Sequence, residues 1–361
     1  MKVLQIITSL ETGGAEKLIL ESVPIYENMG LDVDVLVLKD SKTAFRDQLS
    51  QKISGNVIAL TKKSVYNPLL ILKLAKYLKK YNVIHAHLFP VLYWVVFAKI
   101  ISFSSRPIVF TEHSTNNRRR NYGILKNIEK FVYSKLAFIG CISTGTFDSL
   151  TSFVDVKHKT EIINNGIDVE KFKNRGILAK SDFFQQDDFI LIQVSSFRPQ
   201  KDQETLINAL LKLPPHVKLL LVGDGPLKKS REEQVLKLNL TSRVKFLGNR
   251  FDIPDLLNIS DVVILSSIYE GFGLAIVEGM AAGKPVIASD VDGLREIVQN
   301  YGLLFEKGNS NQLCEQISRL LGNSEYYLEI AFRCSRRAED FSIQNMVDKY
   351  LKIYKKLSDE D

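Results

Sequence analysis

The most informative stretch of the chain is Glu270-Gly-Phe-Gly-Leu-Ala-Ile-Val-Glu278, which carries two carboxylates eight residues apart across the start of a predicted helix. An apolar run at residues 261–266 precedes it and is typical of a buried strand. Gly283 and Pro285 follow it and indicate where the helix ends. The segment is therefore predicted to be a strand, a glycine-containing loop and a short helix.

The first turn of such a helix suits a phosphate or a diphosphate. Its backbone N–H groups have no partner within the helix, and the positive end of the helix dipole lies there. Gly271 and Gly273 would let a ligand approach the backbone closely. Glu278 lies about five residues into the helix, or about 7 Å along its axis. Glu270 and Glu278 are therefore spaced to bind a sugar and a ribose on either side of a diphosphate.

This segment resembles the acidic signature of the retaining nucleotide-sugar glycosyltransferases of family 4, in which seven residues separate two glutamates. The resemblance implies the GT-B fold, an α/β architecture of two Rossmann-like doubly wound domains that face each other across a cleft. It also implies that Glu270 faces the hydroxyls of the donor sugar and that Glu278 binds the ribose. The donor-binding residues between them would be Gly271, Phe272, Gly273 and Leu274. The alternative is an ordinary amphipathic helix on which Glu278 is merely solvated.

Short apolar strands alternate with helical patterns along the chain, which is typical of parallel sheets with crossover helices. Strands are predicted at residues 3–8, 33–38, 56–60, 83–86, 108–110, 137–141 and 161–163, and then at 189–195, 217–222, 244–247, 262–265, 285–288 and 302–305. We therefore predict an acceptor-binding domain over 1–170, a linker over 171–187 and a nucleotide-sugar-binding domain over 188–340. By the resemblance, a C-terminal helix within 341–361 packs back on the first domain.

Three further segments match loops of the family. Gly13 and Gly14 follow the first strand and open a helix, so they could offer backbone N–H groups to the donor phosphates. They resemble the family's glycine loop. His113 directly follows a predicted strand, and its match to the family's strand-end histidine implies that it hydrogen-bonds the transferred sugar or the acceptor region. Gly225 and Gly248 end two strands and resemble the loops that lie along the nucleotide.

Arg198 and Lys201 lie where the family carries an Arg and a Lys that neutralise the leaving diphosphate. Fixed cations beside a group that gains negative charge lower the barrier to its departure. The match is imperfect, because Ser196 occupies the usual Arg position when Lys201 is aligned. No metal and no cofactor are expected, since the helix dipole and these two cations already supply positive charge. The pair His85 and His87, and the Asp290-Val-Asp292 sequence, are interpreted as structural.

The charge of the chain lies mainly in its first half. Residues 1–175 hold 25 Lys and Arg against 15 Asp and Glu, and residues 51–150 hold 15 against 3, within a net charge of +7. Such a basic surface attracts nucleic acid or an anionic membrane leaflet. Residues 69–80, with Arg118, Arg119 and Arg120, are predicted to form a basic amphipathic surface. No aromatic and basic interleaving or reader motif indicates a nucleic-acid partner.

These patterns predict a cytoplasmic enzyme, peripheral at the inner face of the cell membrane, because no stretch approaches the ~20 apolar residues of a membrane helix and no signal cleavage site follows the first strand. The expected reaction transfers a sugar from a nucleotide diphosphate donor, most often UDP-linked in this family, to a lipid-linked saccharide, as in capsule or O-antigen synthesis. The alternatives are a nucleotide-sugar epimerase, a transferase with a small soluble acceptor, a nicotinamide-dependent dehydrogenase and a nucleic-acid-binding module. The dehydrogenase lacks its Gly-x-Gly-x-x-Gly fingerprint here.

Overall fold

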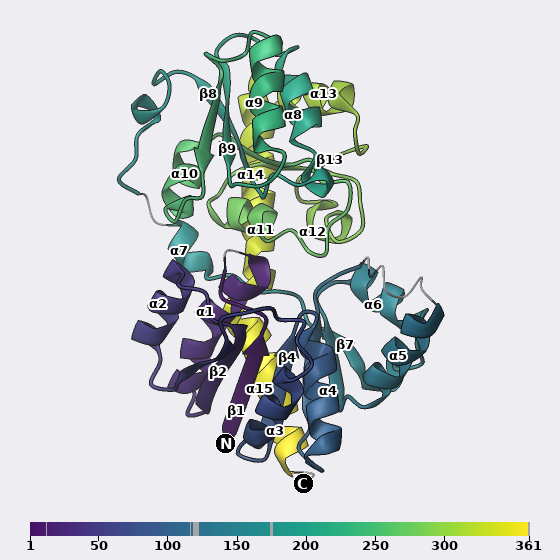
Figure 1. The fold of residues 1–361 in the computed structure, drawn as a ribbon. Helices are drawn as coiled ribbons and strands as arrows, with labels where there is room; N and C mark the ends of the chain where they lie inside the picture. Colours follow the sequence, from purple (N-terminus) through teal and green to yellow (C-terminus); the bar gives the residue numbers. More distant parts are fainter. Residues whose placement is uncertain (12, 116, 118–122, 174–175, 360–361) are drawn as a thin grey trace. The chain divides into compact units, whose positions relative to one another are not determined.

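The computed structural model describes the whole chain except residues 12, 116, 118–122, 174–175 and 360–361 (Figure 1). It divides into two compact units. Unit 1 contains Met1–Gly166 together with Ile343–Asp361, and unit 2 contains Ile167–Ser342. Each unit is built on one fully parallel sheet, so the predicted pair of doubly wound α/β domains is confirmed.

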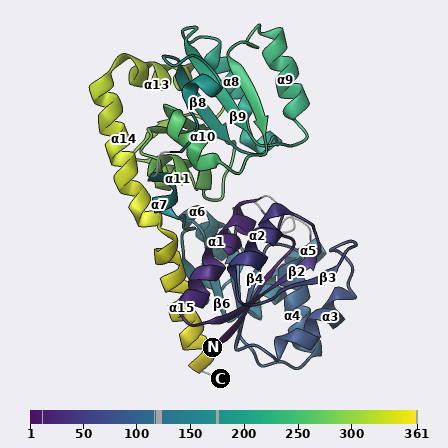
Figure 2. The ribbon, with the colours of Figure 1, turned by 90° about the vertical axis from the view of Figure 1, so that its left-hand side faces the viewer.

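Unit 1 contains a seven-stranded sheet in the order β3-β2-β1-β4-β5-β6-β7. Its strands are β1 (Lys2–Ile7), β2 (Asp32–Lys39), β3 (Val57–Thr61), β4 (Val83–His87), β5 (Ile108–Glu112), β6 (Phe138–Cys141) and β7 (Thr160–Ile162). Its helices are α1 (Gly14–Asn28), α2 (Ala44–Lys52), α3 (Leu70–Leu78), α4 (Val91–Ile101), α5 (Gly123–Ser134), α6 (Thr144–Thr151) and α15 (Ile343–Asp359), with a short 3-10 turn η2 (Lys157–Lys159). In Figure 2, α1 and α15 lie on one face of this sheet and α3 and α4 on the other.

Unit 2 contains a six-stranded sheet in the order β10-β9-β8-β11-β12-β13. Its strands are β8 (Phe189–Val194), β9 (Val217–Val222), β10 (Val244–Gly248), β11 (Val262–Leu265), β12 (Val286–Ser289) and β13 (Leu303–Phe305). Its helices are α7 (Val169–Lys173), α8 (Gln203–Leu210), α9 (Lys228–Lys237), α10 (Ile253–Ile259), α11 (Leu274–Ala281), α12 (Arg295–Val298), α13 (Ser310–Gly322) and α14 (Ser324–Ala338). Three 3-10 turns complete it, η3 (Lys180–Asp182), η4 (Pro199–Lys201) and η5 (Glu339–Phe341).

The strand order of both sheets reverses once. In unit 1 the chain runs from β1 outward to β3 and then returns to β4 on the other side of β1. In unit 2 it runs from β8 to β10 and returns to β11 beside β8. In open parallel sheets ligands bind outside the carboxyl ends of the strands at such a reversal. The fold therefore marks the ends of β1 and β4, and of β8 and β11, as the places to look for function.

The boundary between the units lies after Gly166, whereas the sequence predicted a linker over 171–187. Side-chain burial explains the difference. Val169 and Phe172 of α7 are buried, and α7 contacts α10 and α11 of unit 2. The described residues of the predicted linker therefore belong to unit 2.

The C-terminal helix α15 belongs to unit 1, as the resemblance implied. Its buried side chains recur at helical spacing and pack toward α1 and β4. They are Ile343, Met346, Val347, Tyr350, Leu351 and Tyr354. Two tyrosines among them bring hydroxyl groups into the interior of unit 1, where they meet polar side chains of the sheet. Among the described residues, no helix combines the length and the apolar character that crossing a membrane requires.

Candidate functional site

The predicted donor-binding residues of unit 2 lie along the carboxyl edge of its sheet. Gly248 ends β10, Gly225 follows β9, Lys201 follows β8 and Glu270 follows β11, and these four strands are neighbours in this order. Residues from four separate parts of the chain are therefore brought to one edge. The strand order that does this is not visible in the local sequence pattern.

At the reversal point of this sheet, Lys201 and Glu270 form an ion pair. Their side chains are 20% and 16% exposed, so the pair is shielded from water but still accessible. Ser267 Oγ donates a hydrogen bond to Glu270 Oε2 at 3.3 Å, and the N–H of Gly271 donates to Oε1 at 3.2 Å. A cation and a carboxylate are thus held side by side where the fold predicts a ligand.

The loop that carries Lys201 is fixed by a buried amide that sequence reasoning missed. Gln193 Nε2 donates to the carbonyl oxygen of Lys201 at 2.9 Å, and Gln193 Oε1 accepts a hydrogen bond from Ser266 Oγ at 3.0 Å. Ser266 Oγ also donates to the carbonyl of Asp202 at 2.7 Å. The available signal was one amide in the otherwise apolar strand β8. Because the Gln193 amide and the Ser266 hydroxyl both have hydrogen-bond partners, the position of the Lys201 backbone is well defined.

The start of α11 depends on two close backbone approaches. Gly273 has φ of 93°, which L side chains rarely adopt, and a Cβ atom there would lie 2.4 Å from Leu294 Cδ2. A Cβ atom at Gly293, a residue the sequence reasoning also missed, would lie 2.5 Å from the carbonyl oxygen of Glu270. Both glycines are therefore required by the loop that presents Glu270 and the first amides of α11.

The side chains that follow Glu270 differ in how deeply they are buried in unit 2. Glu278 is the fifth residue of α11 and is 4% exposed, so the alternative in which it is merely solvated is wrong. The side chain of Phe272 is buried and packs edge-on against Phe341, with ring centroids 5.4 Å apart. Phe272 can therefore offer a ligand only its backbone. Leu274 begins the helix and is half-buried.

The remaining predicted residues of unit 2 are two glycines with positive φ and one exposed arginine. Gly225 has φ of 154° and packs against the backbone of Phe197, and Gly248 has φ of 65°. Arg198 lies three residues before Lys201 with an exposed side chain. Within the described part of unit 2, no hydrogen bond or ion pair joins Arg198 to Glu270. The backbone contacts expected of the two glycines stay a prediction.

Asp290 and Asp292 pair with Arg295 rather than with one another. Arg295 Nε lies 2.5 Å from Asp290 Oδ1, and Arg295 Nη1 lies 3.4 Å from Asp292 Oδ1. The two carboxylates therefore serve a surface ion-pair network. Over the described part of the chain, no group of three or more His, Cys, Asp or Glu side chains is arranged to hold a metal ion.

In unit 1 the two predicted glycines lie at the start of α1. Gly14 is its first residue, and Gly13 precedes it in extended conformation. A Cβ atom at Gly13 would lie 2.2 Å from Glu16 Oε2, so the carboxyl group of Glu16 folds back over this glycine. Burial raises the pKa of Glu16 to about 7. The carboxyl group of Glu16 therefore lies over this end of α1.

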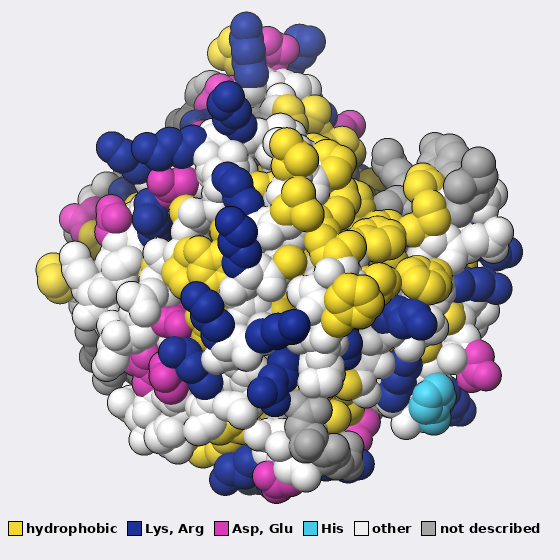
Figure 3. Space-filling model, turned by 60° about the horizontal axis from the view of Figure 1, so that its bottom comes forward, with side chains coloured by type: hydrophobic (Ala, Val, Ile, Leu, Met, Phe, Trp, Pro, Cys, Tyr) yellow, Lys and Arg dark blue, Asp and Glu magenta, His cyan; other side chains and the backbone are white. Residues whose placement is uncertain are grey.

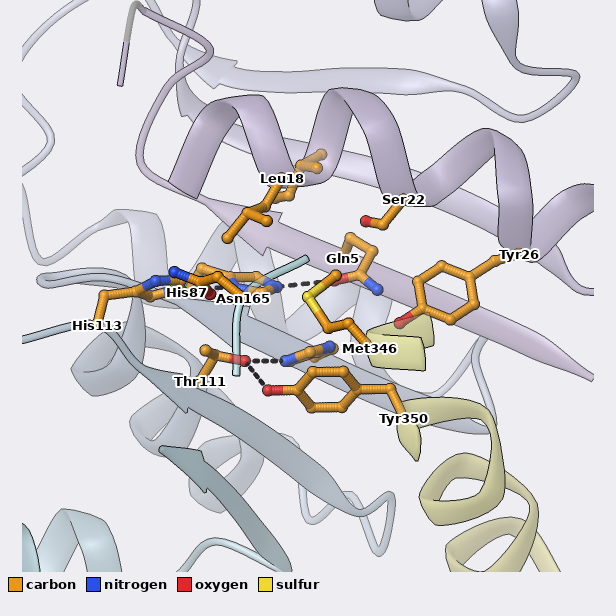
Figure 4. Close-up of a pocket in the computed structure, with 12 residues that line it drawn as sticks. Gln5, Leu18, Ser22, Tyr26, His87, Thr111, His113, Asn165, Met346 and Tyr350 are labelled. Carbon is orange, nitrogen blue, oxygen red and sulfur yellow. Dashed lines mark hydrogen bonds between the residues drawn. The ribbon is translucent and has the colours of Figure 1, made fainter. Parts of the chain in front are cut away.

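His113 lies just beyond the end of β5 and is half-buried. Its Nε2 atom is 3.2 Å from Nδ1 of His87, whose Nε2 atom is 2.9 Å from Oε1 of Gln5 (Figure 4). Burial lowers the pKa of His113 to about 4 and that of His85 to about 3. His85 and His87 are buried at the end of β4 and hydrogen-bonded through both ring nitrogens, as expected for structural residues.

Comparison with known proteins extends this geometry to a family. The family model described as "Glycosyltransferase Family 4" matches residues 12–171, and the family model described as "Glycosyl transferases group 1" matches residues 174–340. Anabaena HepE, solved with UDP and glucose, superposes with a TM-score of 0.87 at 26% identity and covers 99% of this chain and 100% of its own.

Two curated relatives are bacterial enzymes. The N-acetyl-alpha-D-glucosaminyl L-malate synthase of Bacillus anthracis is 30% identical over 64% of this chain and 62% of its own length. The chain thus spans less than two thirds of that relative. A Campylobacter jejuni enzyme is 27% identical over 93% of this chain and 94% of its own; its name describes a 4-alpha-N-acetylgalactosaminyltransferase acting on a diphospho-undecaprenol-linked saccharide. With both domains matched and the fold shared, the chain belongs to the two-domain glycosyltransferases of the GT-B fold.

Proposed function

We propose that this protein transfers a sugar from a nucleotide diphosphate donor, with UDP as the nucleotide, to a hydroxyl group of a lipid-linked saccharide. The observation that carries the proposal is the Lys201–Glu270 ion pair at the reversal point of the unit 2 sheet, beside the start of α11. It combines a cation for the diphosphate with a carboxylate for the sugar hydroxyls. UDP as the nucleotide is supported by the complex of HepE with UDP and glucose.

The roles of the side chains follow from the charge that develops during transfer. The bond between the anomeric carbon and the diphosphate oxygen breaks, and its electrons pass to the diphosphate. The acceptor oxygen forms a new bond to the anomeric carbon, and its hydroxyl proton passes to the departing diphosphate. Lys201 and the amides at the start of α11 stabilise that charge, so no metal and no cofactor are needed. Glu270 orients the sugar, and Glu278, enclosed in α11, binds the ribose hydroxyls. We include retention of the anomeric configuration in the proposal, from the resemblance of this site to the retaining enzymes.

The test is a donor panel with product analysis. Purified protein is incubated with UDP-, GDP- and CDP-sugars, with and without a diphospho-undecaprenol-linked acceptor, and the products are separated and their anomeric configuration is read by NMR. The proposal predicts a new glycosidic bond only with a UDP-sugar and the lipid acceptor. Conversion of the donor sugar with no acceptor present would favour the epimerase alternative instead. Equal transfer to a free soluble sugar would refute the lipid-linked acceptor.

The acceptor proposal is supported by the exposed face of unit 1 around α3 and α4. The apolar stripe of α3 at Leu70, Leu74 and Leu78 is buried in the core, so this stripe is not the membrane-facing surface that residues 69–80 predicted. Lysines and two leucines of the same segment are exposed to solvent instead. Leu69 is 63% exposed and Leu72 is 58% exposed, and Arg118, Arg119 and Arg120 lie outside the described residues.

The end of α4 adds a stronger apolar feature. Ile100, Ile101 and Phe103 are exposed there, Phe103 to 90%, and Phe103 has φ of 49°. A left-handed conformation costs a non-glycine residue about 1–2 kcal/mol, and such strain is commonly associated with function. Figure 3 shows hydrophobic side chains gathered on this side of the molecule with Lys and Arg side chains beside them. Apolar side chains among basic ones suit an anionic bilayer surface, so we propose peripheral binding to the inner membrane leaflet.

Vesicle sedimentation tests the membrane part separately. Removing one aromatic side chain from the bilayer interface costs about 1.5–3 kcal/mol, so Phe103→Ser should weaken binding to vesicles rich in anionic lipid by roughly tenfold or more. The matched control is Phe332→Ser, since Phe332 is 64% exposed on α14 of unit 2. Equal binding of both variants, or indifference of the wild type to anionic lipid, would refute membrane docking through this face.

A further inference from the structure

The interior of unit 1 contains a chain of hydrogen bonds that joins His113 to two tyrosines of the C-terminal helix. Six hydrogen bonds connect its members across β1, β4, β5 and α15. Figure 4 draws these members except Tyr354. The members are His113, His87, Gln5, Tyr354, His85, Thr111 and Tyr350. All of them except His113 are buried, and His113 is at the end of the chain that is partly exposed.

The amide of Gln5 determines which atoms donate and which accept along this series of hydrogen bonds. Its Nε2 atom donates to the hydroxyl of Tyr354 at 3.1 Å, so its Oε1 atom is the one that faces His87 Nε2 at 2.9 Å. A carbonyl oxygen only accepts, so His87 Nε2 carries the proton. A neutral imidazole has one N–H, and His87 Nδ1 therefore accepts from His113 Nε2 at 3.2 Å. His113 thus has its proton on Nε2.

The other branch continues in the same direction. The Tyr354 hydroxyl accepts from Gln5 and donates to Nδ1 of His85, and His85 Nε2 then donates to Thr111 Oγ1 at 2.8 Å. The Thr111 hydroxyl donates to Tyr350 at 2.6 Å. Because His85 Nδ1 accepts from Tyr354, His85 Nε2 carries the proton, so this branch continues in the direction that Gln5 sets. Burial also holds the pKa of His87 well below its usual value, which keeps the imidazoles neutral.

The cavity beside these hydrogen-bonded residues is too small for a sugar. The cavity lined by Gln5, His85, His87 and His113 has a volume of about 20 Å³, close to the room that one water molecule needs. Met346 and Tyr350 of α15 close it from the side of the C-terminal helix (Figure 4). The buried members of the chain therefore act on a ligand only through His113.

We propose that Gln5, His87 and Tyr354 are positioning residues that hold His113 as its Nε2–H tautomer, which leaves Nδ1 as a hydrogen-bond acceptor for a hydroxyl of the bound sugar. The identity of that ligand rests on the proposed function. The tautomer of His113 does not, because the hydrogen bonds within unit 1 determine it. The C-terminal helix is then part of the machinery that prepares the site, as well as part of the core.

Nitrogen NMR of the full chain tests the tautomer directly. With 15N-labelled histidine, and with His113 assigned by His113→Gln, the wild type should show a protonated Nε2 and an unprotonated Nδ1 on His113. His87→Leu and Tyr354→Phe should give a mixture of both tautomers. His87→Gln should preserve the wild-type pattern, because its amide can accept from His113 and donate to Gln5. An Nδ1–H tautomer in the wild type would overturn the proposal.

Turnover gives the second readout. His87→Leu should lower kcat by roughly tenfold or more, which corresponds to about 1.36 kcal/mol per factor of ten, with the KM for the donor changed less than twofold. His87→Gln should recover most of this loss. Tyr81→Phe is the matched control: it also removes a buried tyrosine hydroxyl, which donates to Asp34 at 2.7 Å in the same unit but outside the chain. An equal loss of kcat in Tyr81→Phe and Tyr354→Phe would show that these hydrogen bonds only stabilise the fold, and it would refute the positioning role.

The two proposals can fail independently. If the wild type transfers no sugar from any donor, the proposed function is wrong, while the NMR spectrum still reports whether His113 holds one tautomer. If transfer occurs but the His113 tautomer is mixed in the wild type, the positioning role is wrong and the proposed function stands.

Discussion

Replacing Lys201 by methionine separates the proposed donor-binding role of its ion pair from the contribution of that pair to stability. The substitution keeps the aliphatic length of the side chain and removes the charge that lies beside Glu270. One charge-assisted hydrogen bond contributes about 1.5–3 kcal/mol. If that bond is made to the departing diphosphate, Lys201→Met should lower kcat/KM for the donor by roughly 10- to 150-fold, since each 1.36 kcal/mol changes a rate by a factor of ten.

Unit 2 offers a close control for this substitution. Lys180 pairs with Asp261 at 2.7 Å, and the two side chains are 22% and 20% exposed, much like the Lys201–Glu270 pair. The control pair lies just before β11, at the amino end of the strand, whereas Glu270 follows its carboxyl end. Lys180→Met should therefore destabilise the protein by a similar amount, about 1–3 kcal/mol, and leave donor turnover unchanged.

Three measurements on both variants decide the outcome. Urea unfolding gives the loss of stability, titration calorimetry with UDP gives the affinity, and initial rates over a range of donor concentrations give kcat/KM. The charge-neutralising role of Lys201 is refuted if Lys201→Met binds UDP and turns over as Lys180→Met does. A loss of activity in both variants that follows only their stability would refute it equally.

Other substitutions test single features of the two units. Glu278→Gln should lower the affinity for UDP by roughly tenfold or more and abolish its preference over 2′,3′-dideoxy-UDP; a preference that survives would exclude Glu278 from ribose binding. Gly273→Ala should lower the free energy of unfolding by more than Gly308→Ala, as judged by thermal melting, because both have positive φ but only Gly273 is crowded by a neighbour. The pKa of His113 lies below its unfolded value, so its neutral form stabilises the fold at neutral pH and this contribution is lost as pH falls from about 6.5 to about 4. Urea unfolding at pH 7 and pH 5 should therefore differ less in His113→Gln than in the wild type, while the exposed His158→Gln should behave as the wild type does.

The strands could be predicted from the sequence with few errors, because alternation of apolar runs and helical patterns is a local property. The predicted runs at 189–195 and 217–222, for example, correspond to β8 and β9. The helix after Glu270 was also predicted, since Gly273 and Gly283 mark its two ends. The boundary after Gly166 was not, because a polar composition hides the burial of α7 against unit 2.

The interpretation of α3 shows where local patterns are ambiguous. Apolar residues at helical spacing predict an amphipathic face, but they do not indicate whether that face meets a membrane or the protein core. The structure uses Leu70, Leu74 and Leu78 for the core of unit 1. The exposed apolar side chains are instead Leu69 and Leu72, outside this stripe, and Ile100, Ile101 and Phe103 at the end of α4.

Residue types and their local order were sufficient to predict two parallel α/β domains and the strand, loop and helix around Glu270, since turns, helix ends and strand periodicity depend on near neighbours. The partners in both sites depend on long-range topology. Lys201 meets Glu270 across 69 positions because β8 and β11 are adjacent, and Gln5 reaches Tyr354 across 349 positions because α15 returns to unit 1. Such contacts arise from strand order and helix packing, to which distant parts of the chain contribute jointly, so a short window of sequence does not contain them.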